Sequence, residues 1–148
     1  MLHQISDAQG LMAMTHQDDK EQRYQRGRKM LHTLHGQHGL DIVDGLGAFA
    51  PDFARMIYEF PFADIYDRPA LDLRSRQIAT ISALAAMGNA LPQLDAHIAA
   101  GLHIGLTRQE IIEIIMQIAV YAGFPAAMNG LAAARAVFAR LDEEAPKV

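Results

Sequence analysis

The chain has 148 residues, no cysteine, and a formal net charge of -4. This length fits one domain, which buries enough surface on folding to need neither a disulfide nor a metal for stability. The missing cysteines exclude thiolate nucleophiles, CxxC redox pairs and thiolate zinc sites. The acidic charge balance argues against nucleic acid as a partner. We expect a cytoplasmic protein.

The N-terminal third combines an arm with a helical region. Residues 1–18 lack the basic start and continuous apolar run of a signal peptide, so we expect a flexible arm. Residues 18–35 are charged and helix-favouring, and they predict an amphipathic helix that Gly36 ends. The Gly-rich residues 37–53 predict a short helix or a turn.

Two further helices are predicted in the middle of the chain. Residues 51–67 form an aromatic-rich helix that Pro61 must kink or divide, because proline lacks a backbone N–H donor. The next helix covers residues 73–87. Asp72 is suited to cap its start, and Gly88 is suited to the left-handed conformation that commonly ends a helix.

The clearest boundary precedes the most apolar helix. Residues 92–103 predict a short helix that begins at Pro92 and stops before Gly105, and the sequence TRQE at residues 107–110 is a capping box. The apolar residues that follow form two neighbouring stripes, Ile111, Ile114, Ile115, Ile118, Ala119 and Ala122 in the first and Ile112, Met116 and Val120 in the second. We therefore expect most of this helix to be buried.

A final helix over residues 126–142 is predicted to turn Leu131, Ala134, Val137, Phe138 and Leu141 inward. No convincing strand-like alternation occurs, so the predicted fold class is all-α. The apolar runs are shorter than the roughly 20 residues that cross a bilayer, so we expect no membrane-spanning segment. Two nearly all-apolar helices exceed what a small monomer buries, which predicts self-association.

Few residue types remain that can do chemistry. The three lysines lie in polar terminal regions, which disfavours Schiff-base reactions: Lys20, Lys29 and Lys147. Three histidines stand three residues apart, His32, His35 and His38. Gly36 interrupts the helix between them and no clear carboxylate completes a ligand set, so a solvated helix end is favoured over a metal site.

Three residues stand out on the apolar helices. His97 has Ala100 and Gly101 at i+3 and i+4, which leaves open space above its ring, and it is either a hydrogen-bonded packing residue or a catalytic one. Glu113 must be exposed, paired or placed in a functional cavity, because an unpaired buried carboxylate is costly. Tyr121 has the helical spacing of a core residue.

Two arginines begin the helix of residues 73–87. Arg74 and Arg76 oppose the helix dipole at this end, so a partner anion would stabilise them. Both a pair of surface charges and a site for an anionic ligand agree with this pattern.

Four motifs occur in a fixed order: RPALD at 68–72, AHIAAGL at 96–102, GLTRQEI at 105–111 and YAGFPAA at 121–127. With them the chain resembles the carboxymuconolactone decarboxylase family over roughly residues 23–140. The resemblance implies an AhpD-like multi-helical orthogonal bundle, formed here as a single domain over residues 19–148. It also implies assembly into an oligomeric ring, a trimer or a hexamer.

The family resembled has two branches. The redox branch uses a CxxCxxxH motif with a Glu on the preceding helix. The equivalent stretch here keeps His97 but has no cysteine, and Gln77 stands at the position of the Glu. The resemblance is therefore to the decarboxylase branch. It implies loss of CO2, without a cofactor, from 4-carboxymuconolactone, a small anionic lactone formed in aromatic-acid degradation.

The implied reaction assigns roles to particular residues. His97 would deliver a proton, and Glu113 would orient it. Arg76, Arg74 and Arg28 are candidates for holding the substrate carboxylates, by charge and bidentate geometry rather than by a motif. Two alternatives stay open, a peroxidase-type member that lacks the CxxC and a non-catalytic oligomeric protein that binds small molecules.

Overall fold

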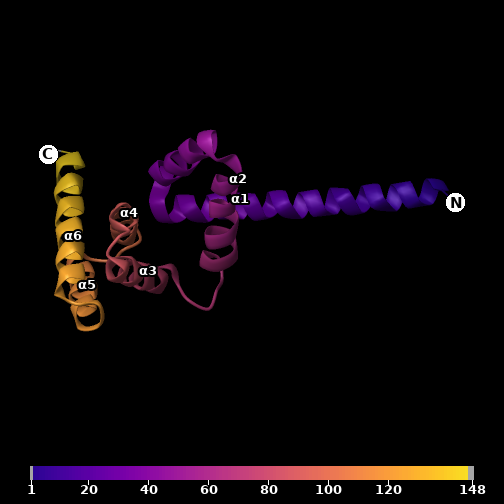
Figure 1. Cartoon of the computed structure of the whole chain (residues 1–148). Coiled ribbons are helices and arrows are strands. Elements are labelled where there is room, and N and C mark those ends of the chain that lie inside the picture. Colours follow the sequence, from indigo (N-terminus) through magenta and orange to yellow (C-terminus); the bar gives the residue numbers. More distant parts are fainter. Residues whose placement is uncertain (1, 147–148) are drawn as a thin grey trace. The chain divides into compact units, whose positions relative to one another are not determined.

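Each secondary-structure element that the computed structural model describes is a helix (Figure 1). The structure describes the backbone of residues 2–146 and the side chains of residues 19–146. The elements are α1 (Leu2–Phe49), α2 (Pro51–Ile57), the π-helix η1 (Tyr58–Tyr66), α3 (Leu73–Met87), α4 (Leu91–His103), α5 (Arg108–Ala122) and α6 (Phe124–Glu144). The predicted all-α class is confirmed. The side chains of the arm predicted for residues 1–18 are not among those described.

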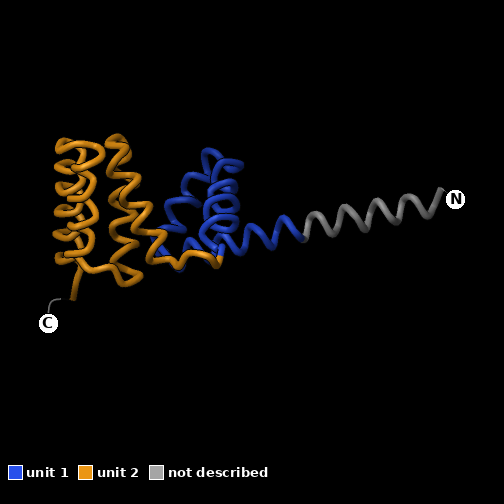
Figure 2. The backbone as a smooth tube through the Cα atoms, turned by 90° about the horizontal axis from the view of Figure 1, so that it is seen from below, with its two compact units in different colours: residues 1–68 blue, residues 69–148 orange. Residues whose placement is uncertain are grey.

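The chain divides into two compact units, residues 1–68 and residues 69–148 (Figure 2). The first unit contains α1, α2 and η1, and the second contains α3 to α6. The core of the second unit is aliphatic and includes Ile81, Leu94, Ile98, Ile111, Ile115 and Val137. The single domain over residues 19–148 stays a prediction.

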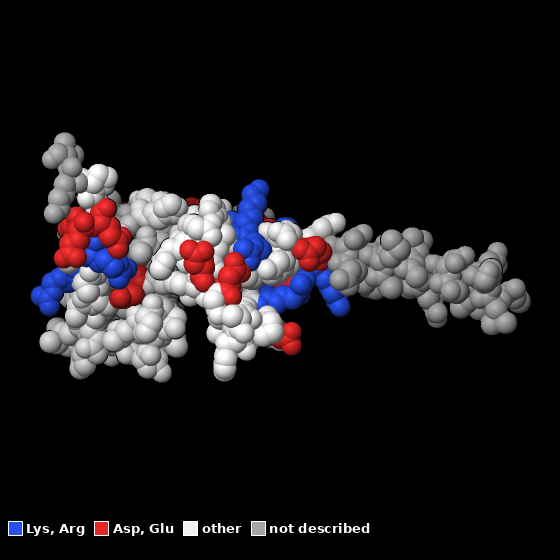
Figure 3. All heavy atoms as spheres, turned by 90° about the horizontal axis from the view of Figure 1, so that it is seen from above, with Lys and Arg blue, Asp and Glu red and all other residues white. Residues whose placement is uncertain are grey.

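The surface carries charges of both signs. On the face drawn in Figure 3, Lys and Arg side chains are interspersed with Asp and Glu. In the second unit, Arg108 pairs with Asp142 at 2.5 Å and Arg140 lies 3.8 Å from Asp95. These two arginines of the second unit therefore lie beside carboxylates. Of the helices described, none is both long and apolar enough to cross a membrane.

Gly36 breaks α1 as predicted. Its φ of 66° and ψ of -163° are not helical, and α1 consists of two helices joined at this kink. A side chain rarely adopts such a φ, which is why glycine suits this position. The following residues form a second helix up to Phe49, with Leu40 and Val43 buried. The segment predicted as a short helix or a turn is thus helical.

Pro61 lies inside a π-helix. The predicted aromatic-rich helix divides at Tyr58, where the α-helical turns of α2 give way to the wider turns of η1. Because a π-helix bonds i to i+5, its altered ladder accommodates a residue without a backbone donor. The stretch changes helix type three residues before Pro61, and Pro61 itself lies inside η1. Tyr58, Phe62 and Ala63 are the buried residues of η1.

The local signals of the second unit are confirmed. The Asp72 carboxylate accepts a hydrogen bond from the Ser75 backbone N–H at 2.7 Å and caps α3, and Gly88 ends this helix with a φ of 73°. Thr107 and Glu110 form the predicted capping box of α5. The last helix begins earlier than expected, at Phe124, because Pro125 fits the first helical turn.

The burial predicted for α5 is wrong on one side. Ile111, Ile115 and Ile118 are buried, as the first stripe predicts. In the second stripe, Met116 is 50% exposed and Val120 76% exposed. The periodicity identifies an apolar surface, but the core formed with α3 and α6 includes only part of the first stripe, and Ala122 at its end is exposed.

Candidate functional site

The centre of the candidate site is a contact between α3 and α4. Gln77, Ile81 and Ala85 are spaced four residues apart and form the buried face of α3. On α4, His97 is half-buried beside the fully buried Ile98. The Nδ1 atom of His97 lies 3.0 Å from the Oε1 atom of Gln77. Two helices thus hold the imidazole and a carboxamide in hydrogen-bonding contact.

Gln77 contacts His97, and sequence reasoning did not include it among the site residues. Its side chain is 0% exposed. Its position was noticeable in the sequence, since it stands where the redox branch has a Glu. The sequence did not reveal that Gln77 contacts His97, because the two residues lie on different helices and meet only when α3 packs on α4.

The two small residues that follow His97 on α4 pack tightly. Ala100 and Gly101 are buried, and a Cβ atom added at Gly101 would lie 3.0 Å from Leu106 and 3.3 Å from Ile81. These small residues therefore let α4 pack closely on its neighbours. The open space expected above the His97 ring stays a prediction.

The arginines of α3 have partners within the chain. Arg74 forms an ion pair with Glu110, the glutamate of the capping box. The Thr107 backbone N–H, followed by Arg74, holds the pKa of Glu110 below its ordinary value. Arg76 is half-buried, and its Nε donates to the Leu71 carbonyl at 3.3 Å. Substrate binding by Arg74 and Arg76 stays a prediction.

Glu113 lies on the exposed polar edge of α5. Its carboxylate accepts a hydrogen bond from Gln109 at 3.0 Å, one turn earlier on the same helix. It lines an open groove of about 420 Å³ that Ile78 of α3 borders. The contact made by Nδ1 of His97 is to Gln77. The orienting role of Glu113 therefore stays a prediction.

Arg28 belongs to a polar cluster of the first unit. Its guanidinium lies 4.9 Å from the centre of the Tyr58 ring and forms two hydrogen bonds with Asp44, at 2.6 and 3.0 Å. The buried Tyr58 hydroxyl also donates to Asp44, at 2.7 Å. Arg28, and then Tyr58, hold the pKa of Asp44 below its ordinary value, while burial raises the pKa of Tyr58. The role of Arg28 as a substrate ligand stays a prediction.

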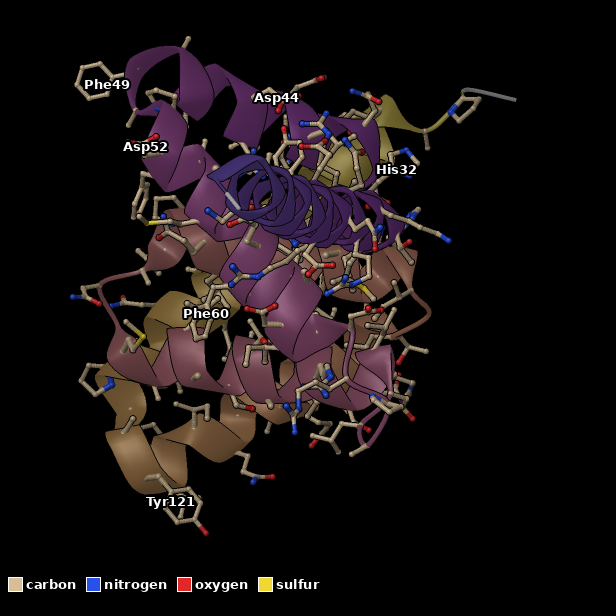
Figure 4. All side chains as sticks on the ribbon, turned by 90° about the vertical axis from the view of Figure 1, so that its right-hand side faces the viewer. His32, Asp44, Phe49, Asp52, Phe60 and Tyr121 are labelled. Atoms are coloured by element: carbon tan, nitrogen blue, oxygen red, sulfur yellow. The ribbon has the colours of Figure 1, made fainter. Side chains whose placement is uncertain are left out.

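The other candidates are spread over the surface. His32 and His38 are exposed, and the His35 ring packs edge-on against Phe62 with centroids 6.0 Å apart. Among the residues described, no three His, Cys, Asp or Glu side chains form a possible metal site. Tyr121 was expected in the core but is 83% exposed and projects away from the ribbon (Figure 4).

Two comparisons with known proteins give the same family. Residues 51–136 match the model of the carboxymuconolactone decarboxylase family, a range that contains both Gln77 and His97. The chain is 32% identical over 129 residues to a 4-carboxymuconolactone decarboxylase of Acinetobacter baylyi, covering 86% of this chain and 96% of that protein. It is 30% identical over 125 residues to an uncharacterized 15.0 kDa protein in the nqo9-nqo10 intergenic region of Paracoccus denitrificans, covering 84% and 93%.

Proposed function

Since the chain belongs to the carboxymuconolactone decarboxylase family, we propose that it is a carboxy-lyase acting on a small carboxylated lactone of the 4-carboxymuconolactone type. The observation that carries this proposal is His97, a half-buried imidazole held on α4 by a hydrogen bond from Nδ1 to Gln77. This hydrogen bond gives the ring a defined position on α4.

The chemistry requires little beyond anion binding and one proton. The bond from the lactone ring to its carboxylate breaks, CO2 leaves, and the electron pair moves through the ring alkene into the lactone carbonyl. The substrate carbonyl is the electron sink, so the proposed reaction uses no cofactor. His97 then donates a proton to the dienolate and regains one from water, a contribution on the order of 10²- to 10⁴-fold in rate.

Arginines are the natural ligands of the substrate carboxylates. Arg76 precedes Gln77 directly on α3, and we retain Arg74 and Arg28 as further candidates by charge. Both already contact carboxylates of the chain, Glu110 and Asp44 respectively. Binding of a substrate anion by either would therefore compete with an existing ion pair.

The proposal is tested by incubating the purified chain with 4-carboxymuconolactone and measuring CO2. We expect catalytic release of one CO2 for each lactone consumed. The same preparation is tested with peroxide and a thiol reductant, where we expect no turnover because the chain has no cysteine. No CO2 at high enzyme concentration would contradict the decarboxylase assignment, and lactone binding without turnover would favour the non-catalytic alternative.

We also propose that the chain self-associates as a trimer or a hexamer, through the tip where α5 meets α6. This apolar tip consists of Met116, Val120, Tyr121, Phe124 and Met128, which are each at least half exposed. None of these residues carries a charge, and large exposed apolar patches are unusual in a soluble monomer. A second copy of the same uncharged surface is a suitable partner.

Replacing Val120 by Glu is expected to weaken this association at least about tenfold, because the new carboxylate would be buried without a partner. Sedimentation velocity over a range of protein concentrations measures the shift to smaller species. Ala145→Glu is the control, since it adds the same charge at an exposed position after α6. Unchanged association of the Val120 variant would show that the apolar tip is not the contact.

A further inference from the structure

Gln77 is an unusual residue for the place it occupies. It shares the buried face of α3 with Ile81 and Ala85, and its side chain is 0% exposed. Among the described residues its Nε2 atom has no hydrogen-bond partner. A buried N–H without a partner destabilises the folded state, so an aliphatic residue would suit packing better here. A role in packing therefore does not explain the carboxamide.

Its contact with His97 does suggest a role. Oε1 of Gln77 lies 3.0 Å from Nδ1 of His97. A carboxamide oxygen can only accept, so this contact requires the hydrogen to be on Nδ1. In the neutral ring, Nε2 is then the acceptor, and in the protonated ring Nε2 carries the proton that can be given away.

We infer that Gln77 is a positioning residue that fixes the tautomer and the orientation of His97 by accepting the hydrogen on Nδ1. This inference rests on the proposed function for its effect on turnover. The tautomer itself is a property of the folded chain and does not depend on which substrate is used. The structural reason is that α3 buries the carboxamide completely, so it cannot rotate away into solvent.

The first test uses heteronuclear NMR of the imidazole nitrogens in the full chain. The spectra are recorded at a pH high enough for the ring to be neutral. His97 is assigned as the signal that is lost in His97→Gln. We expect wild type to hold the hydrogen on Nδ1 and Gln77→Met to lose this preference. A wild-type ring with the hydrogen on Nε2, or an unchanged tautomer in Gln77→Met, would overturn the inference even if the chain decarboxylates no lactone.

A second variant and a control separate positioning from folding. Gln77→Glu keeps an acceptor at the same place and should retain the hydrogen on Nδ1, and loss of it would count against the inference. Ser82→Ala removes another polar group of α3, one that donates to the Ile78 carbonyl at 2.8 Å rather than contacting His97. This control should leave both the tautomer and the kcat within about twofold of wild type.

Kinetics with 4-carboxymuconolactone provide the last readout. Gln77→Met is expected to lower kcat at least about tenfold while KM changes less than about twofold, because a wrongly oriented proton donor affects the reaction more than substrate binding. A kcat equal to that of wild type, together with a lost tautomer preference, would show that Gln77 sets the tautomer without serving catalysis. That result would overturn the inferred role.

Discussion

Replacing His97 by Gln is expected to lower kcat for CO2 release from 4-carboxymuconolactone by about 10²- to 10⁴-fold, because no other group is assigned to protonate the dienolate. Glutamine preserves approximate size and polarity, and His97 is only half-buried, so the fold should persist. Steady-state kinetics measure the loss, and circular dichroism verifies that the helical content is unchanged.

The matched control is His103→Gln. It makes the same substitution on the same helix, at an exposed position in the last turn of α4. Its kcat should stay within about twofold of wild type. If His97→Gln also retained wild-type turnover, His97 would not be the proton donor, and the proposed mechanism would be wrong even if the chain is a decarboxylase.

Replacing Gly27 by Ala is expected to have the largest effect on folding. A Cβ atom at this position would lie 1.9 Å from the Tyr58 carbonyl oxygen and 2.5 Å from its carbonyl carbon. Both are backbone atoms, so no side-chain rotation can relieve the clash, and α1 and η1 must move apart. We expect the free energy of unfolding to fall by at least about 2 kcal/mol, as measured by urea denaturation.

Separating α1 from η1 should also weaken the side-chain contacts that depend on the close approach of Gly27 to Tyr58. The rings of Tyr24 and Tyr58 lie edge to face with centroids 5.3 Å apart, and Tyr58 is bonded to Asp44. Gly45→Ala is the control, because a Cβ there meets nothing within 4 Å. This helical replacement should leave stability unchanged or raise it by about 0.5–1 kcal/mol. Equal stability of the two variants would contradict the proposed clash.

Local sequence signals determined the ends of the helices. Gly36 and Gly88 interrupt or end helices with positive φ values, and the caps at Asp72 and Thr107 form as predicted. These features depend on groups within a few residues of one another, so the sequence alone contains the needed information. His97 was likewise identified as the candidate catalytic residue from its neighbours in the sequence and from the family motifs.

Tertiary structure decided what the helices contact. Helical periodicity places Ile115 and Val120 equally on apolar stripes of α5, but packing against α3 and α6 buries only the first, and Val120 is 76% exposed. Gly101 lies close to Leu106 and Ile81, contacts that its position in the sequence does not show. The sequence by itself determined that this chain is all-helical and carries His97. That Gln77 is the partner of His97 was decided by the packing of α3 on α4, because a contact between helices depends on their relative placement, which no local pattern contains.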